Sequence, residues 1–360
     1  MNIKYIGRAL LVLVMTTAFS VNATAKDKVY KWKLAMSWPK HLTPLSSPPQ
    51  RFAEIVKEMS NGRLIVKVHG PEKHKAALGV FDMTKLGQYQ MSHSGSYYWK
   101  GKDINTLFFT SMPLGMTYDE QTAWFYHGGG LELMQKVYGK HKMYSFPGGN
   151  TGVQMGGWFR KEINSVEDLK GLKMRIPGFA GEIMAKLGVT VTNLPGGELY
   201  TALERGTIDA LEWVGPGMDI KMGFHKVAPY YYTGWHEPAS EMQFMVNKKA
   251  FDKLPKDLQA IVRVAMKAVA SDMYSENYVA SADAWAKMRA EYPNIKVKEF
   301  PMPVLKAMKA VNDELIVKLA QKGPLTKEII ESQKAFLKKA RKWSEISEYS
   351  YLKNMLALEK

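Results

Sequence analysis

Apolar and polar residues alternate near the start of the chain with the period of a β-strand. Trp32, Leu34 and Met36 alternate with lysines over residues 31–37, which predicts a strand. Apolar residues recur with a helical period over residues 47–59, where prolines near the start and an Asn-Gly pair after the end predict the bounds of a helix. Residues 64–69 predict a second strand. A strand, a helix and a strand in this order favour a parallel sheet with helices on its faces.

One pattern of helix, glycine and short strand occurs twice. Residues 80–93 and 199–212 each predict a helix, a glycine at its end and a strand, with a histidine or a glutamate six positions after the glycine. We interpret this pattern as one unit used once in each of two lobes. Ligands of open parallel sheets bind beyond the carboxyl ends of the strands. We therefore expect His93-Ser94 and Glu212-Trp213 to form opposing lips of a cleft.

Later apolar stretches complete the predicted organisation. Residues 143–146 are expected to open the second lobe as a strand, and residues 241–247 to return as a strand to the first. After Pro255 the apolar stripes have a helical period. The predicted division is a signal peptide over 1–25, mainly lobe 1 over 26–145, mainly lobe 2 over 146–240, a return strand and helices over 241–300, and C-terminal helices over 301–360 that brace the lobes or form an oligomer interface.

The first 25 residues predict export. Lys4 and Arg8 precede an apolar run over 9–19 and the cleavage pattern Ala23-Thr24-Ala25. The apolar run is too short for a stable membrane-spanning helix. The chain has no cysteine, so we expect neither disulfides nor a lipoprotein anchor. These features together predict a periplasmic protein.

Composition and charge narrow the class of partner. The chain has 360 residues, of which 46% are hydrophobic, enough for two globular lobes. The formal net charge of +16 is compatible with nucleic acid or anionic membranes as partners. The lysines are, however, scattered beside acids, so no nucleic-acid partner is expected. A diffuse positive field also favours anionic solutes.

Motifs of common enzyme classes are missing. The sequence contains no H-E-x-x-H motif, no thiol nucleophile, no G-x-S-x-G elbow and no glycine-rich phosphate loop. We therefore expect a protein that is not an enzyme. Two alternatives stay open: a periplasmic metal-assisted hydrolase or lyase using Glu212 and His93, and an interaction protein that docks through its basic helical tail.

Four residues are candidates for binding chemistry. Arg175 lies on a predicted strand between apolar neighbours, and a guanidinium holds a carboxylate with two parallel hydrogen bonds; a surface arginine is the alternative. The amide oxygen of Gln154 suits a hard cation such as sodium or calcium, or belongs to an ordinary turn. Glu212 reads as a cation ligand, a structural partner or a solvated charge. The indole of Trp213 either lines a ligand pocket or packs in the hydrophobic core.

Six segments together resemble the substrate-binding proteins of TRAP transporters, the tripartite ATP-independent periplasmic family. The resemblance spans essentially the whole mature chain and is greatest for the branch that binds 2-oxo and 2-hydroxy monocarboxylates. It implies an α/β, two-lobe periplasmic binding protein fold with a cleft between the lobes, long C-terminal helices, and delivery of the solute to a membrane permease. The segments that carry it are 92–99, 149–158, 173–176, 194–198, 202–210 and 212–216.

By position, the resemblance also implies roles for particular residues. Arg175 would grip the carboxylate of the solute, and a sodium or calcium ion would bridge protein and solute. The implied solute contacts are Arg175, Asn150, Gln154, Tyr98 and Trp213. The implied ion ligands are Glu212, Trp213 through its carbonyl, Gln154 and Glu237. The departure at residues 72–75 alters a loop at the edge of the cleft, and the departure at 217–219 leaves the size of the pocket and the solute open. A homodimer through the C-terminal helices is a further expectation.

Overall fold

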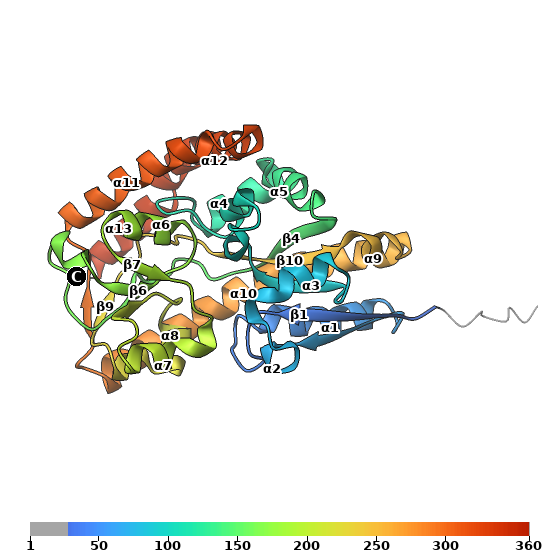
Figure 1. Ribbon diagram of the computed structural model, residues 1–360, viewed down its shortest axis with the longest axis horizontal. Coiled ribbons are helices and arrows are strands. Elements are labelled where there is room, and N and C mark those ends of the chain that lie inside the picture. Colours follow the sequence, from blue (N-terminus) through green and yellow to red (C-terminus); the bar gives the residue numbers. More distant parts are fainter. Residues whose placement is uncertain (1–27, 360) are drawn as a thin grey trace, which may run out of the picture.

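Two α/β lobes lie side by side in the computed structural model, with long helices running along them (Figure 1). The structure describes residues 28–359, so the predicted signal peptide over 1–25 lies outside the described residues. Within 28–359, none of the helices combines the length and the apolar character that crossing a membrane requires.

The first lobe is built on a five-stranded sheet of order β2-β1-β3-β10-β4. β1 runs parallel to β2 and β3, and β10 runs antiparallel to β3 and β4. The parallel sheet predicted from the opening strand, helix and strand is thereby confirmed. The strands of this sheet are β1 (Tyr30–Met36), β2 (Leu64–His69), β3 (Met91–Gly95), β4 (Met143–Asn150) and β10 (Glu241–Asn247).

The helices of the first lobe follow the apolar periods of the sequence. Phe52 and Val56 of α1 are fully buried, and Asn61 and Gly62 adopt positive φ angles of 50° and 78° where the helix ends. The helices of this lobe are α1 (Ser47–Met59), α2 (Pro71–His74), α3 (Val80–Lys85), α4 (Tyr118–His127), α5 (Gly130–Gly139) and α9 (Lys248–Asp252).

The second lobe is built on a six-stranded sheet of order β11-β9-β5-β8-β6-β7. β6 runs parallel to both β7 and β8, so the carboxyl ends of these three strands lie at one edge. The strands are β5 (Gly157–Phe159), β6 (Lys173–Arg175), β7 (Thr190–Thr192), β8 (Ala210–Leu211), β9 (Tyr230–Tyr232) and β11 (Lys296–Lys298), and the helices are α6 (Gly178–Lys186), α7 (Leu199–Glu204) and α8 (Pro216–Met222).

The predicted strand at 143–146 exists, but its expected place in the second lobe is wrong. It forms β4, which pairs with β10 at the edge of the first sheet. Phe146 pairs with Phe244, and Tyr144 pairs with Val246. Cross-strand packing of such side chains stabilises the pairing. The partner strand lies about a hundred residues further along the chain, so local sequence could not indicate it.

Two connections cross between the lobes next to one another. Residues 151–156 lead from β4 to β5, and residues 233–240 lead from β9 to β10. They are joined by backbone hydrogen bonds from Thr151 N to Ser240 O (3.2 Å) and from Gln154 N to Glu237 O (2.9 Å). The pairing places residues 154 and 237 together at the boundary of the lobes.

Long helices from the end of the chain brace both lobes. α10 (Lys256–Glu291) has 36 residues and packs on α1 and β4 in the first lobe and on α8 in the second (Figure 1). α11 (Met302–Ala320) packs on α6, and α12 (Pro324–Ile346) packs on α4 and α5. α13 (Glu348–Leu358) follows α12. The predicted helical tail is confirmed, and it contacts elements of both lobes.

Candidate functional site

Side chains of both lobes meet around one small space. The volume of this space is about 10 Å³, roughly enough for a single water molecule, so the two walls approach closely in this conformation. The first lobe contributes Trp38, Leu45, Tyr97, Tyr98 and Met242, and the second side contributes Gln154, Arg175, Trp213 and Val214.

Arg175 is buried at this boundary, with 1% of its surface exposed. Its Nη1 donates to the carbonyl oxygen of Glu212 (2.6 Å) and to Oε2 of the same residue (3.1 Å). Its Nε donates to the carbonyl oxygen of Leu194 (3.2 Å). The alternative of an exposed surface arginine is therefore wrong. A charge buried this deeply needs anionic or carbonyl partners around it.

The sheet explains why Arg175 and Glu212 come together. Arg175 ends β6 and is in register with Leu211 of β8, so Glu212 is the next residue beyond that strand. The backbone N–H of Glu212 donates to the carbonyl oxygen of Arg175 (3.1 Å). Because the two strands are parallel, their carboxyl ends deliver both side chains to the same edge.

Three titratable side chains form a buried cluster beside Arg175. Glu212, His236 and Glu237 each offer a ligand atom, and these atoms lie within 4.8 Å of one another. Nε2 of His236 lies 3.6 Å from Oε1 of Glu212, which is too long for a hydrogen bond, and neither ring nitrogen of this histidine has a hydrogen-bond partner within residues 28–359.

Burial governs the electrostatics of this cluster. It raises the pKa of Glu212 to about 8, although the charge of Arg175 acts in the opposite direction. Burial and the neighbouring Glu212 raise the pKa of Glu237 to about 7. Burial also lowers the pKa of His236 to about 4. A bound cation would favour the ionised carboxylates, because an opposite charge nearby stabilises the charged form.

Gln154 leaves an acceptor unused at the same place. Its Nε2 donates to Oγ1 of Thr151 (2.9 Å), whereas its buried Oε1 has no hydrogen-bond partner in the described chain. Hard cations such as sodium and calcium are bound by carboxylate and amide oxygens. The oxygens of Gln154, Glu212 and Glu237 therefore fit such an ion. The imidazole of His236 is the one nitrogen donor in the cluster.

Trp213 covers the guanidinium. The centroid of its ring lies 5.2 Å from Cζ of Arg175, within the range of a cation–π contact. The ring also packs on the backbone of Gly196, where an added Cβ would lie 2.4 Å from a ring atom. Any side chain at position 196 would displace the indole, so glycine is required there by close approach.

Asn150 is placed differently from the other implied solute contacts. Its Nδ2 donates to Oε1 of Gln121 (2.9 Å) and to Oε2 of Glu241 (3.0 Å), and its Oδ1 accepts from the N–H groups of Gly152 and Ser240. Both polar atoms of this amide are thus engaged by groups of α4, β10 and the interlobe connections. Arg175, Tyr98, Gln154 and Trp213 line the shared space, and Asn150 is not part of that lining.

His93 does not form a lip of the cleft, so that expectation is wrong. The side chain is fully buried; its Nδ1 accepts from Nε1 of Trp38 (2.9 Å) and its Nε2 donates to the carbonyl oxygen of Gly148 (3.0 Å). Oγ of Ser94 lies 2.6 Å from Oγ of Ser37. The first lobe instead meets the site through Tyr97 and Tyr98, which follow β3 directly. Both nitrogens of His93 are engaged, which leaves neither for proton transfer.

The buried state of His93 predicts an acid-sensitive contribution to stability. Burial lowers its pKa from 6.5 to about 4, so the unfolded chain binds a proton more readily. Because the unfolded chain takes up this proton first, His93 should lower the free energy of unfolding by about 3 kcal/mol as the pH falls from 6.5 to 4. Urea unfolding at pH 7, 5.5 and 4.5 should show a shallower acid loss for His93→Gln than for the parent. An equal dependence of unfolding free energy on pH in the two proteins would contradict the prediction. Another buried histidine of low pKa, His236, is present in both, so its contribution cancels in the comparison.

Sequence reasoning missed several residues of the site, Trp38 and His236 among them. Trp38 lines the space from the loop after β1, and His236 belongs to the acidic cluster. His236 could have been found from the sequence because it directly precedes Glu237, which the family resemblance implied as an ion ligand. No periodic pattern marks Trp38, because it lies in the irregular segment after a strand.

Comparisons with known proteins identify the family of the chain. Residues 34–322 match the family described as bacterial extracellular solute-binding protein, family 7. A curated relative from Nostoc sp. is described as a monocarboxylate 2-oxoacid-binding periplasmic protein. It is 39% identical to this chain over 344 residues, which cover 95% of this chain and 93% of the relative.

Two solved structures are similar along nearly the whole chain. A TRAP periplasmic solute-binding protein from Colwellia psychrerythraea, with bound calcium and pyruvate, has 60% identity and a TM-score of 0.90, covering 91% of this chain and 100% of that one. Another, from Pseudoalteromonas atlantica with bound sodium and pyruvate, has 58% identity and a TM-score of 0.90, covering 91% and 99%. The two-lobe fold expected from the sequence is thereby confirmed.

Proposed function

The chain belongs to family 7 of the bacterial extracellular solute-binding proteins, and from this premise we propose that it is a TRAP receptor for a small 2-oxo or 2-hydroxy monocarboxylate. It binds the solute between its lobes together with a sodium or calcium ion. Two relatives at 60% and 58% identity were solved with pyruvate and with calcium or sodium, which supports the same solute class here.

The observation that carries this proposal is the buried guanidinium of Arg175 at the boundary of the lobes. Its partners are the carbonyl oxygen and the carboxylate of Glu212. A guanidinium also suits the carboxylate of a solute, because its planar fork donates two parallel hydrogen bonds. In the low dielectric between closed lobes these charged hydrogen bonds are stronger than in water.

The cation would be held by buried oxygens at the boundary of the lobes. Gln154 supplies the unpartnered Oε1, and Glu212 and Glu237 supply carboxylates. When bound, the ion gives the site a positive charge that an oxygen of the solute can share. The carbonyl of Trp213, implied by the family resemblance, is a further proposed ligand.

Aromatic side chains of the first lobe close over the solute. Tyr97 and Tyr98 lie opposite Arg175 and Trp213, and Trp38 completes the wall. Closing two lobes around a ligand is the hinge type of domain motion, and residues 151–156 and 233–240 are the connections that would bend. The closed receptor would then dock on the membrane permease of the transporter, in the periplasm.

The alternatives from the sequence lose their support. Membership in a family of solute-binding proteins makes this chain a receptor and not an enzyme. His93, which the enzymatic alternative used, holds Trp38 and Gly148 in the core. The basic helices α11 and α12 pack on elements of the two lobes, so they have a structural role in the fold.

Calorimetry with a short panel of acids tests the proposed solute class. Pyruvate and lactate should bind, and acetate should bind at least about tenfold more weakly, because it lacks the second oxygen that a bound ion can share. NMR of the same mixtures should show no product. Equal binding of acetate would contradict the role of the second oxygen, and absence of binding by all three would overturn the proposal.

The C-terminal helices are proposed to form a homodimer. Large apolar side chains at the end of α12 and in α13 are each more than half exposed, which water disfavours: Trp343, Ile346, Tyr349, Leu352 and Leu356. A two-fold pair of chains would bury the same patch on both copies. Sedimentation equilibrium should find a dimer for the parent and a monomer for Leu352→Glu.

The matched control for this test is Lys353→Glu, which adds an acid at the neighbouring position of α13 and should leave the dimer intact. A parent chain that stays monomeric at about 100 μM would contradict the proposed interface, since chains that form a specific dimer associate well below that concentration.

A further inference from the structure

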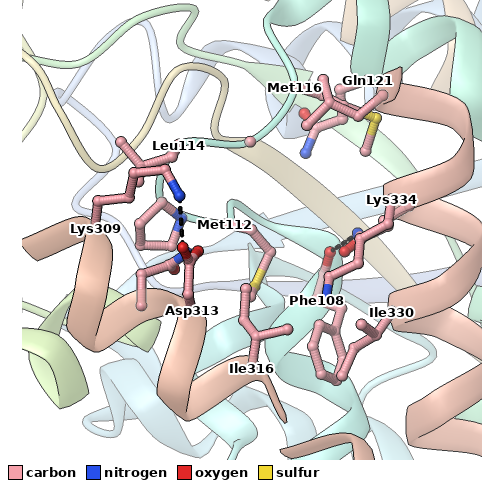
Figure 2. A pocket seen from close by; sticks show the side chains of 15 residues that line it. Phe108, Met112, Leu114, Met116, Gln121, Lys309, Asp313, Ile316, Ile330 and Lys334 are labelled. Atoms are coloured by element: carbon pink, nitrogen blue, oxygen red, sulfur yellow. Dashed lines mark hydrogen bonds and ion pairs between the residues drawn. The ribbon is translucent and has the colours of Figure 1, made fainter. Parts of the chain in front are cut away.

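A second cavity lies where α11 and α12 pass over the segment that follows residues 104–109 (Figure 2). It shares no lining residue with the space around Arg175. Its volume is about 230 Å³, roughly eight times the volume share of one water molecule and below the usual range for drug-sized ligands. A ligand of about ten non-hydrogen atoms matches this size.

The floor and sides of the cavity are apolar. Phe108 and Met112 form the floor, and Ile316 of α11 faces Ile330 of α12 across the space (Figure 2). Met116 lies at the far end (Figure 2). Flexible methionine side chains beside an aromatic ring adapt well to a flat apolar group. The walls therefore suit the hydrocarbon body of a ligand, an aromatic ring above all.

The rim carries positive charge from both facing helices. Lys309 of α11 is paired with Asp313, whereas Lys334 of α12 has neither an ion pair nor a hydrogen bond among the residues described. Lys338 and Lys342 continue the positive charge along the adjoining groove. An unpaired lysine beside an apolar cavity provides a partner for an organic anion.

Asn312 also lines the cavity on the α11 side, but its Oδ1 is buried away from the open space and cannot accept from a ligand there. The site thus combines an apolar body with a cation at its rim.

We propose that this cavity is a second binding site, for a small aromatic carboxylate. The ring lies between α11 and α12, and the carboxylate pairs with Lys334 at the rim. The site is separate from the cleft and depends on none of its residues, so the proposal stands or falls independently of the solute proposed for Arg175.

Methionine methyl NMR on the mature chain tests this site with 4-hydroxyphenylacetate as the probe. Met112 and Met116 line the cavity, whereas Met242 lines the cleft, so the three methyl groups report the two places separately. Each signal is assigned with a Met→Leu variant. The probe should shift the signals of Met112 and Met116 and leave that of Met242 unchanged. Pyruvate should do the reverse.

Matched ligands and variants test the chemistry of the proposed site. 2-(4-Hydroxyphenyl)ethanol keeps the ring and hydroxyl without the carboxylate, and it should bind about tenfold or more weakly. Lys334→Met should weaken the probe by a similar factor, whereas Lys327→Met, on the same helix but outside the cavity lining, should not. Ile316→Trp, which fills the space, should abolish binding.

Three results would overturn the proposal. In the first, the probe shifts only the signal of Met242. In the second, it shifts none of the three signals at about 10 mM, a concentration at which even millimolar affinity would be seen. In the third, the alcohol binds as well as the acid. If Ile316→Trp fails to fold, the comparison of Lys334→Met with Lys327→Met decides the question, because both positions are exposed.

Discussion

Arg175→Ala is expected to weaken the binding of pyruvate by about 2–5 kcal/mol, on the order of thirtyfold to several thousandfold in Kd. The guanidinium is buried and is the one cation among the residues that line the space between the lobes. Without it, the carboxylate of the solute would enter a dry site without a positive partner. Calorimetry at fixed sodium and calcium concentrations measures the change.

Two variants control for other causes of that loss. Arg175→Lys keeps the charge but not the planar fork, and it should show an intermediate loss. Arg205→Ala removes an exposed arginine and should bind as the parent does. Unchanged affinity in Arg175→Ala would end the assignment of this residue.

Folding of the variant needs its own check, because Arg175→Ala leaves Glu212 buried without its partner. Removing one member of a buried ion pair is strongly destabilising, whereas replacing both is often neutral. Arg175→Met combined with Glu212→Gln removes both charges. If the single variant is unfolded, this double variant should fold and bind pyruvate more weakly than Glu212→Gln alone, which serves as its reference because Glu212 is itself a proposed ligand of the ion.

Removal of sodium and calcium is expected to weaken pyruvate binding by about 5- to 150-fold, the range of typical coupling between two ligands. The buried oxygens of Gln154, Glu212 and Glu237 favour a cation, and the cation in turn favours the anionic solute. By reciprocity, pyruvate should tighten the binding of the ion by the same factor. Titration in chelated, sodium-free buffer, followed by addition of each ion, measures this coupling.

Gln154→Met separates a bound ion from a general effect of salt. It removes the unpartnered Oε1 at similar volume, so added ions should restore binding in the parent far better than in the variant. Gln321→Met changes an exposed glutamine and should respond as the parent does. Equal affinity of the parent with and without ions would remove the cation from the proposed mechanism.

Local sequence patterns predicted most of the elements. The strand β10 and the helix α1 occur over the expected residues, because alternation and helical periodicity report directly which face of an element is buried. Arg175 could be singled out because it is a charge among apolar strand residues. Its neighbour Glu212 followed from the parallel arrangement of strands, in which carboxyl ends meet.

Other features depended on residues that are distant in the chain. His93 carried the same local signal as Glu212, yet Trp38 and Gly148 engage both of its nitrogens. Asn150 is likewise held by Gln121 and Glu241. Whether a buried polar atom is engaged by the protein or left for a ligand depends on partners that only the folded chain brings within hydrogen-bonding distance.

Sequence patterns were sufficient to predict that this chain folds as two α/β lobes, that an arginine lies on one strand and a glutamate at the end of another, and which protein family it resembles. Tertiary structure alone decided that β4 belongs to the first sheet, that His236 joins Glu212 and Glu237, and that His93 is part of the core. The physical reason is the range of the interactions. Periodicity records burial residue by residue, whereas strand pairing and hydrogen-bond satisfaction are settled between segments that meet only after folding.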